Sequence, residues 1–155
     1  MTAIAPDLVV HTAGHVGLNV IDLDRSKDFY RHVFGLELAG EGAEGSRRWA
    51  FLTGGGRLVL TLWQQATDPF SPAASGLHHL SFEVESIERV RIAEDRLRAI
   101  GADFVYDGVV PHGESVDSGG IFFTDPDGTR LEIFAATGAG EADAPNGSAP
   151  TCGFF

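Results

Sequence analysis

Alternation of apolar and polar residues in two places along the chain predicts two equivalent strands. The first stretch is 15–20 and the second is 79–84, and in each the apolar residues occupy every second position. This spacing is typical of a strand with one buried face. Each stretch begins with a histidine, at the same point of the pattern. The two halves of the chain are therefore predicted to repeat one structural unit.

A helical pattern follows each of these strands. The first helix is expected to start at the acidic stretch after Asp22 and to end at Gly35. The second is expected to start at Ser86 and to end at Gly101. Further strands are predicted at 36–39, 49–53 and 57–63 in the first half, and at 103–106, 120–124 and 130–135 in the second. Each half then reads βαβββ, and the predicted class is α+β, with two modules whose curved mixed sheets surround a shared metal-containing cavity.

The boundaries of the modules follow from the same pattern. Residues 13–64 and 77–136 are expected to form the two βαβββ modules, joined by a linker over 65–76. Residues 1–12 are expected to be an N-terminal extension. Residues 137–155 are rich in Gly, Ala and Pro and lack periodicity, which predicts a flexible tail.

Composition narrows the class of protein. A chain of 155 residues suits one domain or two half-size modules with a common core. Its net charge of −11 argues against nucleic acid or an anionic membrane as a partner, since both require clustered cations. With one cysteine, Cys152, no intrachain disulfide forms. Neither a signal peptide nor a membrane span is recognisable, so a cytoplasmic protein is expected.

Strand parity brings three potential metal ligands together. If alternate residues of each strand pack on the helices, His15, His79 and Glu132 point to the opposite side, into the predicted cavity. Two imidazoles and one carboxylate suit a single divalent metal ion with open coordination positions. The expected ion is Fe2+, Mn2+, Zn2+ or Ni2+, and the sequence does not distinguish them. By the same parity His78 faces the helix side and is not expected to be a ligand.

Aromatic residues are predicted to line the same cavity. By parity they are Trp49, Phe51, Trp63, Phe122 and Phe134, which would suit a flat organic substrate. Arg48, Tyr106, His112 and Glu114 lie on or beside loops and are candidates for polar contacts, although each also fits an ordinary surface residue. The loop 109–119 has the length of a lid.

Several segments resemble the vicinal-oxygen-chelate superfamily, the group of glyoxalase, bleomycin resistance protein and extradiol dioxygenase. They are 15–20, 24–30 with 34–36, and 124–128 with 131–133. The superfamily also includes fosfomycin-resistance transferases and methylmalonyl-CoA epimerase. The resemblance covers roughly residues 13 to 136 and implies the fold and the metal site. It does not imply one reaction, because the members share a scaffold rather than a chemistry.

Departures from the family pattern narrow the choice of activity predicted for this chain. The glyoxalase and epimerase branches use a further ligand late in the first module, where this chain has Leu60 or Thr61. The resemblance to extradiol dioxygenases and fosfomycin transferases is closer, since both hold their metal with two His and one Glu. Both, however, tend to carry a Tyr where this chain has Phe122. The second-shell His of extradiol enzymes has no counterpart between Trp63 and Leu77.

The expected function is therefore that of a divalent-metal-dependent enzyme acting on a small organic substrate that chelates the metal through adjacent oxygens. Its chemistry would be dioxygenase-like or lyase- or transferase-like rather than that of glyoxalase I, with Glu132 as the catalytic residue. The alternatives are a metal-free drug-sequestering protein of the bleomycin-resistance type and a structural or partner-binding module. Because modules pair between chains in several relatives, we predict a homodimer in which His15 comes from one chain and His79 and Glu132 from the other.

Overall fold

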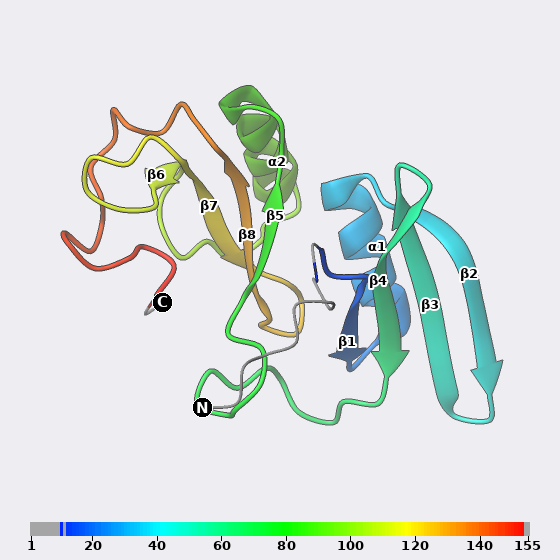
Figure 1. The fold of residues 1–155 in the computed structure, drawn as a ribbon. Helices are drawn as coiled ribbons and strands as arrows, with labels where there is room; N and C mark the ends of the chain where they lie inside the picture. The colour runs from blue at the N-terminus through cyan, green and yellow to red at the C-terminus, as the bar shows by residue number, and fades with distance from the viewer. Residues whose placement is uncertain (1–9, 11, 154–155) are drawn as a thin grey trace, which may run out of the picture.

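The computed structural model describes residue 10 and residues 12–153, which form two modules of the same design (Figure 1). The first module contains β1 (Val16–Val20), α1 (Leu23–Phe34), β2 (Glu37–Glu44), β3 (Arg47–Gly54) and β4 (Arg57–Gln64). The second contains β5 (Leu80–Glu83), α2 (Ile87–Ala99), β6 (Val110–Pro111), β7 (Gly119–Thr124) and β8 (Arg130–Ala135). The predicted α+β class and the βαβββ repeat are confirmed.

Each module has a four-stranded mixed sheet. The strand orders are β1-β4-β3-β2 and β5-β8-β7-β6. In both sheets the first strand pairs in parallel with the last strand of the module, while the remaining pairs are antiparallel. The strands that follow His15 and His79 therefore hold equivalent edge positions in the two sheets.

The ends of the helices follow the local sequence signals. Asp22 caps α1 by accepting a hydrogen bond from the backbone N–H of Arg25, at 3.0 Å. The helix ends at Gly35, whose φ of 66° is a left-handed conformation that glycine adopts without strain. Ser86 precedes α2 without a side-chain capping bond, and Gly101, with φ of 69°, follows the end of that helix.

Two strands differ from the sequence prediction. The strand predicted at 36–39 is longer, because β2 continues to Glu44 and pairs with β3 along its length. The segment 103–106 does not form a strand and contributes only an isolated bridge between Phe104 and Phe123. Gly101 and Gly108, both with positive φ, turn the chain on either side of this segment, so it is too short for a ladder. The fourth strand of the second sheet is β6.

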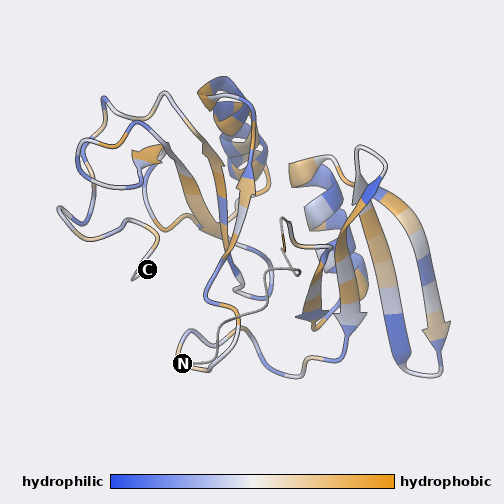
Figure 2. Cartoon of the chain, in the orientation of Figure 1, coloured by the Kyte–Doolittle hydropathy of each residue, from blue (hydrophilic) through white to orange (hydrophobic). Residues whose placement is uncertain are grey.

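One apolar core joins the two modules. Helix α1 covers its own sheet and also reaches the second sheet: the ring centroids of Phe34 and Phe82 lie 4.4 Å apart, and those of Phe29 and Phe123 lie 6.5 Å apart. Figure 2 shows apolar residues along β7 and β8, and an α2 that carries both apolar and polar residues. Because the helix-facing sides of both sheets share this core, their other faces lie on outer sides of the molecule. The two sheets do not close around a common cavity within the single chain.

A polar junction fixes the second module to the start of α1. Asp127 forms an ion pair with Arg25 and accepts a hydrogen bond from the backbone N–H of Ile21, at 2.9 Å. The hydroxyl of the fully buried Tyr30 donates to Asp125, at 2.8 Å. Burial raises the pKa of Asp125, and burial followed by the charge of Asp125 raises the pKa of Tyr30 well above its ordinary value.

The segment after β8, residues 136–153, is called here the C-terminal strap. It returns to the second sheet, and its residues Ala139 and Thr151 are buried. Flexibility of residues 137–155 stays a prediction, and Phe154 and Phe155 lie outside the described residues. Across the part of the chain that the structure describes, neither helix has the length and apolar character needed to cross a membrane.

Candidate functional site

The outer face of the second sheet carries two of the three predicted ligands. Glu132 lies in the middle of β8, between Phe122 of β7 and Ser81 of β5 in the strand register. Its neighbours Leu131 and Ile133 are buried on the helix side. His79 directly precedes β5. The Glu132 side chain therefore points away from the helices.

The Glu132 carboxylate is buried, and its two oxygens contact two different imidazoles. Its side chain is 3% exposed, and Oε2 lies 3.7 Å from Nε2 of His79. Its other oxygen, Oε1, is in close contact with Nε2 of His112. The ion pairs of this carboxylate within the described residues are these two. Each oxygen therefore faces a different histidine.

Hydrogen bonds define the state of His112. A carboxylate only accepts, so the N–H at Nε2 of His112 donates this hydrogen bond to Glu132. The other ring nitrogen, Nδ1, lies 2.8 Å from the hydroxyl of Ser118 and accepts from it when the ring is neutral. This arrangement fixes both the tautomer and the rotation of the ring. Partners of this kind orient metal-ligating carboxylates in many proteins.

From the sequence alone, His112 is predicted only to be a candidate for polar contacts. It follows the two-residue strand β6, which is too short to show alternation, and it lies inside the loop expected to act as a lid. Its only signal in the sequence was its place in that loop. The tertiary fold makes it a direct partner of Glu132.

The surroundings of His79 favour its neutral form, which is the form that binds metals. Burial, the largest effect, lowers its pKa below the ordinary value, although the charge of Glu132 acts in the opposite direction. Its Nδ1 lies 2.8 Å from Nδ1 of His78. Nε2 is the atom that faces Glu132, so it is the nitrogen that would contact a metal ion held next to that carboxylate.

His15 lies apart from this pair. It is exposed, directly precedes β1 of the first sheet, and lines a groove shared with Ser81 and Glu83 of β5. Among residues 10 and 12–153 no group of three or more His, Cys, Asp or Glu side chains is arranged to hold a metal ion. The structure of one chain therefore brings His79 and Glu132 together and leaves His15 on the other sheet.

The five predicted aromatic residues fall into two groups. Trp49, Phe51 and Trp63 share the outer face of the first sheet, and the rings of Phe51 and Trp63 meet edge to face at 6.0 Å. Trp63 is 37% exposed. Phe122 and Phe134 lie on the outer face of the second sheet. The two groups belong to different sheets, like His15 and Glu132.

The ring of His112 connects the second group to Glu132. Its centroid lies 5.1 Å from that of Phe134 and 6.4 Å from that of Phe122. Phe122 is fully buried, with Tyr106 edge-on at 5.5 Å. An apolar surrounding of this kind strengthens electrostatic interactions with the carboxylate, because water does not screen them.

The two donors on the second sheet are spaced so that one divalent metal ion would contact both. Two ligands at about 2.1 Å from one ion lie at most ~4.2 Å apart, and the 3.7 Å between Nε2 of His79 and Oε2 of Glu132 is within this limit. A nearly buried carboxylate beside imidazoles is a favourable environment for a cation. With Oε1 engaged by His112, Glu132 would bind through Oε2 alone.

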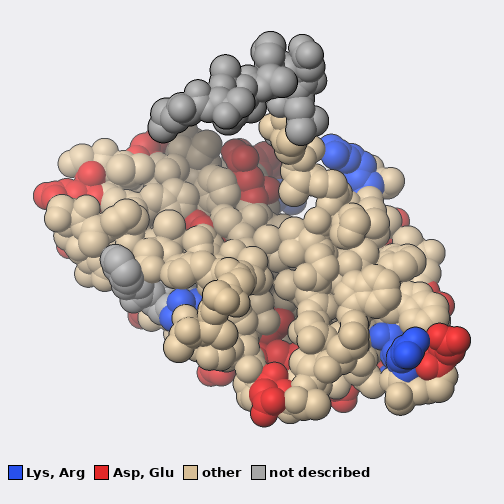
Figure 3. Space-filling model, turned by 60° about the horizontal axis from the view of Figure 1, so that its bottom comes forward, with Lys and Arg blue, Asp and Glu red and all other residues tan. Residues whose placement is uncertain are grey.

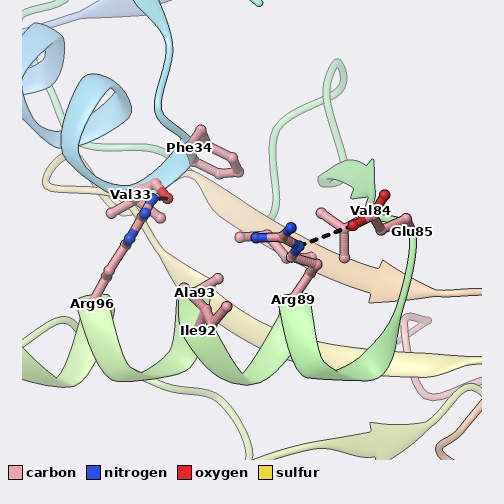
Figure 4. A pocket seen from close by; sticks show the side chains of 9 residues that line it. Val33, Phe34, Val84, Glu85, Arg89, Ile92, Ala93 and Arg96 are labelled. Carbon is pink, nitrogen blue, oxygen red and sulfur yellow. Dashed lines mark hydrogen bonds and ion pairs between the residues drawn. The ribbon is translucent and has the colours of Figure 1, made fainter.

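A separate pocket lies on the helix side of the second sheet. This pocket, shown in Figure 4, lies between α1 and α2. Its charged groups are engaged: Arg89 pairs with Glu85 at 3.0 Å, and Arg96 donates to the carbonyl of Val33 at 3.2 Å. On the face shown in Figure 3, acidic side chains appear in several separate places, in keeping with the net charge of −11.

Two βαβββ modules with an imidazole–carboxylate site define a class of small α+β proteins of the glyoxalase fold. The Glyoxalase/Bleomycin resistance protein/Dioxygenase superfamily matches residues 12–133, and the chain belongs to this superfamily. The resemblance inferred from the sequence segments is thereby confirmed.

Individual relatives refine this placement. A glyoxylase/bleomycin resistance protein/dioxygenase domain from Frankia sp. EAN1pec is 30% identical, with a TM-score of 0.69 over 82% of this chain and 98% of that one. The manganese complex of the fosfomycin resistance protein FosX from Listeria monocytogenes has a TM-score of 0.62 over 86% of this chain and 98% of that one. At 20% identity, the latter likeness shows the fold.

A dioxygenase is among the similar sequences. Catechol-2,3-dioxygenase of Bacillus subtilis (strain 168) is 26% identical over 132 residues, which are 81% of this chain. The match covers 43% of the length of that enzyme, so this chain spans less than half of it.

Proposed function

We propose that this chain is a divalent-metal-dependent enzyme that acts on a small organic substrate with two adjacent oxygens. The proposal rests on one observation above all: Glu132, a carboxylate with 3% of its side chain exposed, forms its ion pairs among the described residues with His79 and His112. A metal ion held by His79 and Glu132 would supply a Lewis acid that stabilises charge developing on the substrate oxygens.

The residues around the ion have separate roles in this proposal. His79 and Glu132 bind it, and His112 holds the carboxylate so that Oε2 faces His79. Phe122 and Phe134 exclude water and, together with His112, form an aromatic surface for an unsaturated or otherwise flat substrate. The dioxygenase-like or lyase- or transferase-like activity is favoured over that of glyoxalase I, because Thr61 and Leu60 supply no carboxylate on the first sheet.

The third ligand is proposed to come from a second copy of the chain. His15 lies on the first sheet, whose helix side shares a core with the helix side of the second sheet. Within the described residues the outer faces of the two sheets therefore do not meet, and Trp63 on the outer face of the first sheet is 37% exposed. Pairing the first sheet of one chain with the second sheet of another would bring His15 to His79 and Glu132.

A mixing experiment tests the metal and the assembly together. Chains carrying His15→Ala and chains carrying Glu132→Ala are unfolded, mixed and refolded, and bound metal is measured by titration after removal of excess ion. If sites form between chains, each heterodimer contains one intact site, because both substitutions fall in the other site. If sites form within one chain, every site keeps one lesion and full-affinity binding does not return.

Controls separate these outcomes from damage to the fold. Each variant refolded alone is expected to lack full-affinity metal binding. His32→Ala removes an exposed imidazole from α1 and is expected to bind metal like the unmodified chain. A chain that remains monomeric at micromolar concentration would contradict the proposed assembly, and an unmodified chain that binds no divalent metal would contradict the proposed chemistry.

A further inference from the structure

The loop between β6 and β7 carries His112 at one end and Ser118 at the other. The two ends are joined twice: the backbone N–H of His112 donates to the carbonyl of Ser118 at 2.9 Å, and the ring Nδ1 lies 2.8 Å from the Ser118 hydroxyl. The position of the imidazole beside Glu132 therefore depends on the backbone at residues 111–112 and 118.

The C-terminal strap holds this loop near Ser118. The backbone N–H of Ala139 donates to the carbonyl of Asp117 at 2.9 Å, and that of Gly140 donates to the Asp117 carboxylate at 3.3 Å. A Cβ at Gly119 would lie 2.3 Å from the carbonyl oxygen of Val110 and 2.6 Å from Cβ of Ala139, so β6 and the strap together leave no room for a side chain there. The strap is thus packed against the loop rather than only passing over it.

Thr151 holds the other end of the loop. It is fully buried, its backbone N–H donates to the carbonyl of His112 at 3.0 Å, and its hydroxyl donates to the carbonyl of Pro111 at 2.6 Å. Its own carbonyl accepts from the hydroxyl of Tyr106 at 3.0 Å. One residue of the strap therefore binds two consecutive carbonyls, of which the second belongs to the residue that contacts Glu132.

We propose that Thr151 is a positioning residue of the site, which acts through His112. By holding the carbonyls of Pro111 and His112, it fixes the backbone from which the imidazole reaches Glu132, while Ser118 fixes the rotation of the ring. The effect of this positioning on metal binding rests on the function proposed above, because the effect requires that Glu132, once oriented by His112, binds the ion. The strap is then part of the site and not an appendage to the fold.

The chemistry of the hydroxyl allows a matched pair of variants. Thr151→Val keeps the shape of the side chain but removes the donor, so the buried carbonyl of Pro111 loses this partner. Thr151→Ser keeps the donor and removes a methyl group. If the hydroxyl positions His112, the Ser variant behaves like the unmodified chain and the Val variant does not.

The direct readout is the state of His112 in metal-free protein. The chain contains six histidines, and the ring 15N signals of His112 are assigned by comparison with His112→Gln. In the unmodified chain we expect a protonated Nε2 and a hydrogen-bonded Nδ1. In Thr151→Val we expect the chemical shifts of these signals to move toward the average of the two tautomers, and in Thr151→Ser we expect them to stay in place.

Tyr30→Phe is the control for general destabilisation. It also removes one buried hydrogen bond, to Asp125, but on the helix side of the sheet. It is expected to lower stability and to leave the His112 signals unchanged. His112 signals that are unaffected in Thr151→Val, or that move equally in Thr151→Ser or Tyr30→Phe, would overturn the positioning role.

Metal titration then tests the consequence separately. Removal of outer partners of metal ligands typically weakens metal binding by 10- to 100-fold, and Thr151→Val, one step further out, is expected to weaken it about tenfold. If the unmodified chain binds no metal, the proposed function fails, while the ring signals still decide whether Thr151 positions His112. If metal binds equally well to the Val variant, the coupling between strap and metal is refuted.

Discussion

Replacing Glu132 by Gln is expected to weaken metal binding strongly while leaving the shape of the site intact. The amide keeps an oxygen that accepts from Nε2 of His112, so the contact that orients the side chain survives. What is lost is the negative charge next to His79. The matched variant is Glu83→Gln, which removes one negative charge from β5, beyond the strand position paired with Glu132.

The structure predicts very different magnitudes for the two variants. Two unit charges about 4 Å apart in an effective dielectric of about 20 interact by roughly 4 kcal/mol, and a divalent ion in direct contact with the buried Glu132 carboxylate would interact with it more strongly than this. After the cost of desolvation, we expect at least a ~100-fold loss of affinity. Glu83 is exposed and ~13 Å along its strand from His79, which exceeds the Debye length of about 8 Å, so less than a ~3-fold change is expected.

Isothermal titration of the metal-free proteins with Mn2+ or Zn2+ measures both affinities, and circular dichroism checks that the variants are folded. A similar loss of affinity in both variants would refute the assignment of Glu132 as the charged ligand. It would show instead that the groove lined by His15 and Glu83 takes part in binding.

Two further predictions concern the junction between the modules. Phe123 is fully buried and contacts the rings of Phe29, Phe34 and Phe104. Denaturant titrations of Phe123→Ala should therefore show a free energy of unfolding lowered by about 3–5 kcal/mol. A loss below ~1 kcal/mol would contradict a common core. Because burial raises the pKa of Asp125 in the folded state, its protonated form contributes stability that is fully present below the ordinary pKa of 3.8 and is lost as the pH rises through the folded-state pKa. Asp125→Asn should therefore flatten the decline of unfolding free energy above pH 4, and identical pH profiles for the two proteins would exclude this role.

Local sequence signals were sufficient for most of the fold. The alternation in β1, the capping by Asp22 and the glycine after α1 involve residues that are near neighbours in the chain, so their physical effect can be recognised without the tertiary structure. Prediction was less accurate for β2 and for residues 103–106. Whether such segments become strands depends on a partner far away in the sequence, as the single bridge of Phe104 to Phe123 illustrates.

The same distinction applies to the site. Strand parity was enough to place Glu132 on the outer face of its sheet, because the alternation of side chains is a local property of any strand. It was not enough for His112, which follows a two-residue strand and reaches Glu132 only through the pairing of β6, β7 and β8. The composition of the tail, likewise, contained no sign that Thr151 lies against the backbone of His112.

The sequence by itself determined the two βαβββ units and their helices, since these follow from periodicity and capping along a few consecutive residues. Only the tertiary structure decided which candidates meet. Its common core places the helix sides of both sheets together, so that His79, His112 and Glu132 converge on one outer face while His15 remains on the other sheet. The physical reason is that helix packing between modules depends on the fit of side chains such as Phe34 and Phe82 across the interface, and no local pattern encodes that fit.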